Sequence, residues 1–311
     1  MSRNESELSR RDFIVGCSGL AATGGIWTGG GATRVVDTHT HFYDVDRPGG
    51  VPWPPRSETV LYRPHLPPEF KQLTSRHGVV GTVVVEASPW LEDNQWVLDL
   101  AKESPGIVGF VGNLAVGEPG FADHLRRFRQ NPLFIGLRLG ERSLVGGVTQ
   151  DVFMNDLRRV AGEGLALDAL VGASGLVAVE QVARQIPSLR IMIDHLPFDA
   201  LDHDLEKARQ IISPLAAREN IHAKVSNVIR LRGGKVVMEQ AEYRSRLDLL
   251  WDLFGGKRLV YGSNWPVSNR ISSYEQQLQV VAGYFQARGK VAVDDYFYGN
   301  SRRFYRWIER R

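Results

Sequence analysis

From residue 34 onward, short apolar segments alternate with amphipathic ones, and this alternation constrains the fold more than any other feature. The apolar segments are typical of buried strands and span residues 35–42, 81–88, 107–114, 135–140, 165–171, 190–196, 221–227 and 258–265. The amphipathic segments predict helices over residues 67–77, 92–104, 120–130, 151–163, 176–185, 204–219, 241–254 and 273–288. Eight strands alternating with eight helices predict a parallel, closed (β/α)₈ TIM barrel in one domain, 34–311.

The same alternation also fits an open, doubly wound sheet, because it does not reveal whether the sheet closes. No Gly-x-Gly-x-x-Gly follows the first strand, so a nucleotide-binding version of that sheet has no support. Residues 43–68 form a long loop after the first strand and are expected to lie over the barrel mouth. Residues 294–311 predict an extra C-terminal helix that caps the outside of the barrel.

The first 33 residues differ from the rest of the chain. Ser-Arg-Arg-Asp-Phe-Ile at residues 9–14 precedes an apolar run rich in glycine and alanine. This pattern resembles a twin-arginine export signal, so we expect the protein to be exported to the periplasm after cleavage between about residues 22 and 32. The apolar run is too short and too rich in glycine for a stable membrane span.

The composition narrows the classes of partner and cofactor. The formal charge of +3 is small for 311 residues, and the basic residues are scattered, so nothing points to nucleic acid. Cys17 is the single cysteine, which excludes an intramolecular disulfide and a cysteine-based zinc site. A small-molecule substrate is expected, and any metal ion must be held by histidine and oxygen ligands. The substrate and the oligomeric state stay open.

Two histidines follow one another on alternate positions at the end of the first strand. Side chains in a strand alternate between faces, so His39 and His41 point the same way, roughly 6–7 Å apart along the chain. Two neutral imidazoles in this position can hold one divalent metal ion, zinc or manganese. The alternative is a pair of ordinary histidines at a strand end.

The ends of other strands carry further candidates, since reactive groups in such barrels gather at the C-terminal ends of the strands. His195 closes the sixth strand and is a candidate third metal ligand or catalytic base. Arg138 lies within a strand, where an unpaired charge is costly, so it pairs with a carboxylate such as Glu86 or binds a substrate oxygen. Lys224 leaves the same two alternatives open. Four other histidines, His65, His77, His124 and His203, fall in loops or helices and are predicted to lie on the surface.

Five short motifs occur in a characteristic order: His-Thr-His at 39–41, Ile-Asp-His-Leu-Pro at 193–197, Ala-Lys-Val-Ser at 223–226, Tyr-Gly-Ser-Asn-Trp-Pro at 261–266 and Gly-Asn-Ser-Arg-Arg-Phe-Tyr at 299–305. As a set they resemble the amidohydrolase superfamily, and within it the "amidohydrolase 2" group that includes L-fuconolactonase-like and 2-pyrone-4,6-dicarboxylate lactonase-like enzymes. The resemblance implies a barrel, a His-x-His on the first strand, a later histidine and an aspartate that ends the last strand. Some members hold one divalent metal ion, whereas the dicarboxylate lactonases are considered to work without one.

One position departs from the family pattern. The usual Gly-Ser-Asp-Trp-Pro reads Gly-Ser-Asn-Trp-Pro here, so Asn264 replaces the aspartate that takes a proton from the attacking water. A neutral amide has no basic site at neutral pH, although its oxygen can position a water molecule or bind a metal ion weakly. Another base is then needed, and His195 and Glu86 are the candidates.

Three hypotheses follow. The first is a metal-assisted hydrolase that opens a sugar-acid lactone or a related cyclic ester by water attack on the carbonyl, with Arg138, Lys224 and Trp265 holding the substrate. Metal-independent action is an alternative form of the same reaction. The second is a non-catalytic or weakly active binding protein, supported by Asn264. The third is a decarboxylase-type lyase of the same superfamily.

Overall fold

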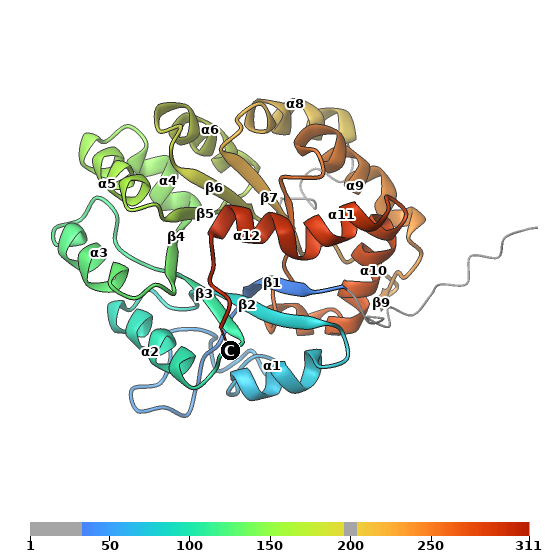
Figure 1. Ribbon diagram of the computed structural model, residues 1–311, viewed down its shortest axis with the longest axis horizontal. Helices are drawn as coiled ribbons and strands as arrows, with labels where there is room; N and C mark the ends of the chain where they lie inside the picture. The colour runs from blue at the N-terminus through green and yellow to red at the C-terminus, as the bar shows by residue number, and fades with distance from the viewer. Residues whose placement is uncertain (1–32, 196–203, 311) are drawn as a thin grey trace, which may run out of the picture.

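In the computed structural model, which describes residues 33–195 and 204–310, eight parallel strands form one curved sheet surrounded by helices (Figure 1). The strands follow one another around the sheet in the order β1-β2-β3-β4-β5-β6-β7-β10. They are β1 Val35–Thr40, β2 Val79–Val85, β3 Ile107–Gly112, β4 Phe134–Gly140, β5 Ala166–Leu170, β6 Arg190–Asp194, β7 Ile221–Val225 and β10 Leu259–Tyr261.

The sheet closes between its first and last strands. Thr40 forms a parallel bridge with Trp265, and the backbone N–H of His41 donates to the Trp265 carbonyl at 2.8 Å. Thr38 Oγ1 adds a hydrogen bond to the Tyr261 carbonyl. The predicted (β/α)₈ barrel is therefore confirmed, and the open sheet is wrong.

Helices lie along the outside of the barrel. They are α1 Pro67–Thr74, α2 Leu91–Lys102, α3 Phe121–Arg129, α4 Glu141–Gly147, α5 Asp151–Gly162, α6 Leu176–Gln185, α8 Leu205–Ala216, α9 Ala241–Phe254 and α10 Tyr274–Gln286. Their ends carry local signals: Ser273 and Gln276 form a capping box at α10, and Gly255 ends α9 with a φ of 69°. Two features were not predicted, α4 and an antiparallel hairpin of β8 Leu231–Arg232 and β9 Lys235–Val236.

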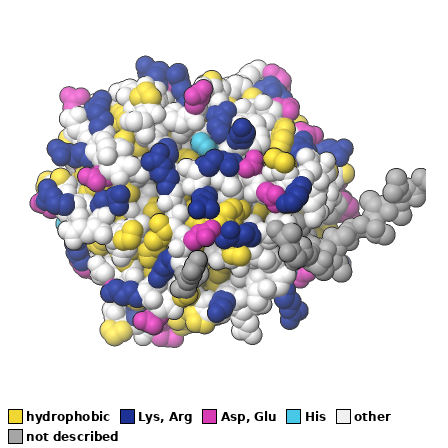
Figure 2. Space-filling view, in the orientation of Figure 1, with side chains coloured by type: hydrophobic (Ala, Val, Ile, Leu, Met, Phe, Trp, Pro, Cys, Tyr) yellow, Lys and Arg dark blue, Asp and Glu magenta, His cyan; other side chains and the backbone are white. Residues whose placement is uncertain are grey.

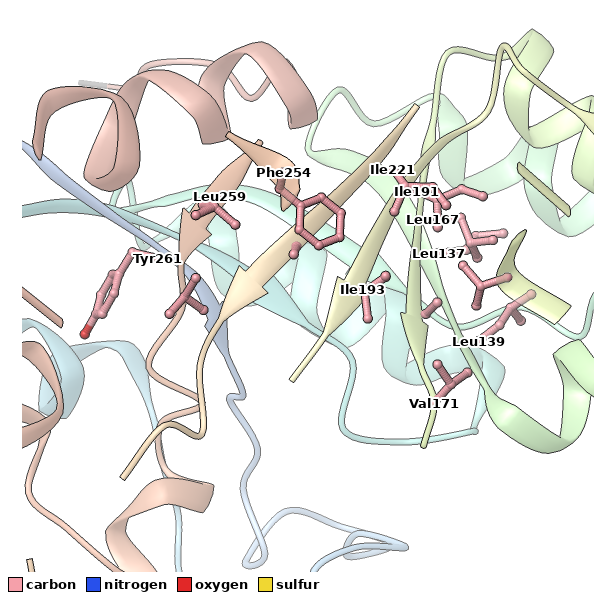
Figure 3. Close-up of a cluster of buried hydrophobic side chains, with 14 of the residues drawn as sticks. Leu137, Leu139, Leu167, Val171, Ile191, Ile193, Ile221, Phe254, Leu259 and Tyr261 are labelled. Carbon is pink, nitrogen blue, oxygen red and sulfur yellow. The ribbon is translucent and has the colours of Figure 1, made fainter. Parts of the chain in front are cut away.

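Apolar residues fill both sides of the sheet, as the strand pattern required. The outer cluster joins strands to helices, and Figure 3 shows part of it, with Leu137, Leu167, Ile191 and Leu259 from four strands and Phe254 from α9. The inner cluster lies among the strands themselves: Val36, Val83, Val85, Val108, Val111, Ile135, Ala166, Met192 and Val260, together with Phe304, Tyr305 and Trp307 from the C-terminal segment. The barrel is therefore packed on both faces, and only its rim is free for chemistry.

The C-terminal segment closes the end of the barrel where the strands begin. Asn300 Nδ2 donates to the Leu259 carbonyl at 2.8 Å, and Arg190 Nη1 donates to the Phe304 carbonyl. Figure 1 shows α12 lying across this end. The predicted C-terminal helix is present, but it spans residues 290–305 and closes the barrel end instead of capping the outside. Helix α11 Lys290–Asp294, the π-helical turn Asp295–Gly299 and α12 Asn300–Tyr305 follow one another without a break, and residues 306–310 are not helical.

The predicted leader and the segment 196–203, which includes His203, lie outside the described residues. No helix within the described residues is long and apolar enough to cross a membrane. Lys and Arg side chains are spread over the face shown in Figure 2 among acidic ones, without forming a stripe.

Candidate active site

A pocket of about 430 Å³ opens at the C-terminal ends of the strands. It is lined by residues from several strand ends and from the loops after them: His41, Trp53, Glu86, Ala87, Ser88, Pro89, Asn113, Arg138, Leu170, His195, Asn264 and Val267. Trp53 belongs to the long loop after β1, so this loop reaches the barrel mouth as predicted. The volume of the pocket lies within the range of small-molecule sites.

The three histidines named from the sequence converge at this rim. The ring centroids of His39 and His41 are 4.9 Å apart, and those of His39 and His195 are 4.2 Å apart. His39 is completely buried below the pocket, whereas His41 and His195 line it. Residues from β1 and from the end of β6 are thus brought together although 154 positions separate His41 from His195.

All three imidazoles are held neutral by burial. Burial lowers the pKa of His41 to about 3 and that of His195 to about 4, and it lowers the pKa of His39 well below its ordinary value. The Lys224 ammonium lowers the pKa of His39 further. At neutral pH these rings therefore act as hydrogen-bond partners, metal ligands or bases, and not as cations.

His41 faces the amide that replaces the family aspartate. Its Nδ1 lies 2.9 Å from the Val85 carbonyl, so Nδ1 carries the proton and Nε2 carries the lone pair. Asn264 Oδ1 lies 3.2 Å from this Nε2, which sets two acceptors against each other. Reversing the amide resolves the conflict, because Nδ2 then donates to His41 Nε2, and a reversed Asn227 amide can donate to the Asn264 oxygen.

The backbone at the pocket is strained where it carries these groups. His195, Asn227 and Asn264 have positive φ angles of 47°, 55° and 59°. This left-handed region is uncommon for residues other than glycine, and such strain concentrates at functional sites. The strand ends are therefore shaped to direct side chains toward the pocket.

Arg138 and Glu86 form the pair that the sequence left open. Arg138 Nε donates to Glu86 Oε1 at 2.7 Å, Nη2 lies 2.6 Å from the same oxygen, and Nη2 also donates to the Glu86 carbonyl at 3.0 Å. Both residues line the pocket. The ion pair with Glu86 is confirmed, and this bond occupies a carboxylate oxygen of the predicted base.

A buried charge cluster lies beneath the histidines. Lys224 Nζ lies 2.7 Å from Asp168 Oδ2, 2.8 Å from Asp194 Oδ1 and 3.1 Å from His39 Nδ1, and all four side chains are completely buried. Tyr305 OH, from the C-terminal end of α12, donates to both Asp168 oxygens at 2.9 Å. The cluster thus links the closed end of the barrel to His39.

Charges within this cluster depend on one another. Burial works against the Lys224 ammonium, but Asp168 and Asp194 raise the pKa of the lysine above its ordinary value. Burial likewise opposes ionisation of Asp194, yet the Lys224 ammonium holds the pKa of that carboxyl well below its usual range. Burial raises the pKa of Asp168 to about 7. The lysine is therefore charged and holds at least Asp194 as a carboxylate.

Two predicted substrate-binding residues lie behind the pocket. Lys224 has no exposed surface, and Trp265 is 1% exposed and packs against Phe42 and Phe70. Direct contact with a substrate does not fit this burial. The surface predictions for His65 and His77 are wrong, because both side chains are buried under the loop and helix that follow β1.

Sequence reasoning missed several residues of the site. Asp168 lies inside an apolar strand segment, and Asp194 directly precedes His195, so each was a buried acid that needed a cationic partner. That signal was available but did not identify Lys224 as the partner. Ser226, whose Oγ lies 2.7 Å from His195 Nδ1, belongs to the motif at 223–226 but was given no role, and Trp53 had no distinguishing signal.

The separations between the three histidine rings decide whether they can hold one metal ion. Two imidazoles on one tetrahedral ion, with bonds of about 2.0–2.1 Å, place their ring centroids roughly 5 Å apart. The separation of His39 and His41 fits this value, but that of His39 and His195, at 4.2 Å, is too short. Among residues 33–195 and 204–310, no three His, Cys, Asp or Glu side chains are arranged to hold a metal ion. The rings converge, but the spacing of His39 and His195 does not fit a shared ion.

Comparisons with known proteins agree with this fold and this rim. The amidohydrolase family matches residues 36–307. A Burkholderia ambifaria protein named L-fucono-1,5-lactonase is 30% identical over 240 residues, covering 75% of this chain and 80% of the relative. A Burkholderia multivorans protein of the same name is 25% identical over 283 residues, covering 87% and 95%.

Solved structures show the same fold. A crystal structure of a Burkholderia multivorans amidohydrolase with bound zinc has a TM-score of 0.78 and 22% identity, covering 89% of this chain and 100% of that one. The closed barrel with histidines at its rim defines an amidohydrolase-type hydrolase. The chain belongs to the amidohydrolase family.

Proposed function

We propose that this hydrolase opens a small cyclic ester, a sugar-acid lactone, by adding water to the ester carbonyl. The observation that carries the proposal is the convergence of a guanidinium, a neutral imidazole and an amide, from Arg138, His195 and Asn264, in one pocket at the rim. The names of the two Burkholderia relatives support a lactone as the substrate class.

Arg138 is the proposed electrophilic group. Glu86 holds Nε and Nη2, and Nη1 has no hydrogen-bond partner among the described residues. A guanidinium fixed in this way can donate to the lactone carbonyl oxygen and stabilise the negative charge that develops as water adds. Glu86 then acts as a positioning residue, in place of the predicted base.

His195 is the proposed general base. In the tautomer in which Nδ1–H donates to Ser226 Oγ, Nε2 carries the lone pair that takes a proton from the attacking water. The ring later returns this proton to the leaving alkoxide, which completes the ring opening. Because burial lowers the pKa of His195 to about 4, the base is neutral but weak.

Asn264 orients the water without taking its proton. Loss of a well-matched general base typically slows a reaction by about 10²–10⁴-fold, so a slower hydrolase is expected than one with aspartate at this position. We derive no step through a metal ion, because the spacing of His39 and His195 does not fit one.

The test uses the purified chain from residue 34 onward with a panel of five- and six-membered aldonolactones. Acid release in a pH-stat is expected for at least one lactone, without release of carbon dioxide. Arg138→Met should lower kcat/KM by about 10²–10³-fold, while Arg209→Met, at a partly exposed arginine of α8 that pairs with Asp252, should not change it. Binding without turnover would establish the non-catalytic alternative, and carbon dioxide release would establish a lyase.

We also propose export to the periplasm by the twin-arginine pathway, on the motif at residues 9–14. A reporter fused to residues 1–40 should reach the periplasm. Replacing Arg10 and Arg11 by lysine should retain it in the cytoplasm, while replacing Arg3 should have no effect. Equal export of both variants would contradict the proposal.

A further inference from the structure

The lysine below the histidines directs its ammonium protons at buried acceptors. An ammonium group has three donors and no acceptor. Nζ of Lys224 donates to Asp168 Oδ2 at 2.7 Å, lies 3.1 Å from His39 Nδ1, and forms an ion pair with Asp194 Oδ1 at 2.8 Å. The side chain is completely buried, so no water competes for these protons. One proton is therefore directed at the imidazole nitrogen.

This contact decides which nitrogen of His39 is protonated. A nitrogen that accepts a hydrogen bond from an ammonium must present its lone pair, so Nδ1 is unprotonated and the proton of the neutral ring is on Nε2. We infer that Lys224 locks His39 in this tautomer, so that His39 is a hydrogen-bond donor beneath the pocket and not a metal ligand. Lys224 is thus a positioning residue.

The second nitrogen of the His39 ring, Nε2, supports the inference. Nε2 is buried and has no hydrogen-bond partner among the described residues. A buried donor without an acceptor is destabilising, so this N–H is left for an oxygen that arrives from outside the chain. The ring contacts His41 and His195, both of which line the pocket. A water molecule or a substrate carbonyl oxygen is the chemical class that fits this donor.

The cluster also contains the group that would reverse the tautomer. Asp194 Oδ1 lies 3.5 Å from His39 Nδ1, within reach of a proton on that nitrogen. Without the ammonium, Nδ1–H would donate to this carboxylate, and Nε2 would gain the lone pair that a metal ion requires. Lys224 therefore selects between a hydrogen-bonding histidine and a metal-binding one. This inference concerns the resting enzyme and holds whether or not a lactone is the substrate.

The primary test is ¹⁵N NMR of the wild-type chain labelled at histidine, with the His39 signals assigned by their loss in His39→Gln. A protonated Nε2 and an unprotonated Nδ1 are expected. A proton on Nδ1 would overturn the inference. This measurement needs no substrate and no altered lysine, so it is independent of the lactonase proposal.

The second test compares two variants of the cluster. Lys224→Met should move the proton to Nδ1 and raise the affinity for zinc, measured by titration of the metal-free protein, at least tenfold over wild type. Asp168→Asn disturbs the same cluster but keeps the ammonium, so it should keep the wild-type tautomer and zinc affinity. An unchanged tautomer in a folded Lys224→Met variant, or the same change in both variants, would contradict the inference. If Lys224→Met does not fold, the wild-type spectrum decides.

Discussion

The hydroxyl of Tyr305 connects the plug at the closed end of the barrel to the buried charges beneath the site, and Tyr305→Phe tests this link. Tyr305 donates to both oxygens of Asp168 at 2.9 Å, and neither residue is more than 1% exposed. The substitution removes one oxygen and leaves the ring packing intact. Asp168 Oδ1 then has no donor, because Lys224 contacts Oδ2. A buried hydrogen bond to a charged group contributes about 1.5–3 kcal/mol, and we expect this loss in the free energy of unfolding.

Tyr296 offers a matched control. It is equally buried and comes from the same segment, but its hydroxyl donates to a neutral acceptor, the Val225 carbonyl, at 3.2 Å. Tyr296→Phe should cost about 0.5–1.5 kcal/mol. The measurement is urea unfolding at pH 9, above the pKa of about 7 to which burial raises Asp168, so that this carboxyl is ionised. Unfolding is followed by far-UV circular dichroism, and the slope m is compared between variants to confirm a common unfolded state.

A double-mutant cycle then isolates the contact. Tyr305→Phe should lower the free energy of unfolding clearly less in an Asp168→Asn background, because the carboxylate that accepts the hydrogen bond of the hydroxyl is gone. Additive effects, or a loss no larger than that of Tyr296→Phe, would refute the argument that the plug is tied to the site through a charged hydrogen bond.

The remaining predictions concern activity and acid stability. Because the base His195 has a pKa of about 4, kcat/KM should fall as pH drops through that value and stay level at neutral pH; a midpoint near pH 6.5 would contradict this assignment. Ser226→Ala frees His195 Nδ1, so kcat should fall about tenfold while KM changes little in initial-rate assays. Asn264→Asp restores the family acid beside His41 and should raise turnover by about 10²-fold or more in initial-rate assays. Burial lowers the pKa of His41 and of His222 to about 3, so below pH 6.5 the unfolded state binds more protons than the folded state. The free energy of unfolding should therefore fall by about 1.4 kcal/mol per pH unit for each histidine as the pH drops below 6.5. Urea unfolding at pH 7 and pH 5 measures this fall.

Local pattern was sufficient to place most of the elements. β-Branched runs such as Val83–Val85 marked strands because both faces of a parallel strand are apolar, and the helix 241–254 was predicted at its observed bounds. The C-terminal helix was predicted, but its position was not. Its aromatic residues suit a helix that packs on the outside, whereas Tyr305 and Trp307 pack into the barrel end.

The sequence by itself determined which chemical groups lie at the rim. The apolar pattern locates the ends of the strands, and His39, His41, His195 and Arg138 lie near those ends. Their pairing was decided by closure of the barrel, which makes residues of β1, β5, β6 and β7 face one another and places Lys224 among Asp168, Asp194 and His39. The local sequence around a lysine in a strand is the same whether the side chain faces a substrate or two buried acids. Only the tertiary structure distinguishes these roles, because the protonation of a histidine depends on which atom lies 3 Å away and not on its neighbours in the chain.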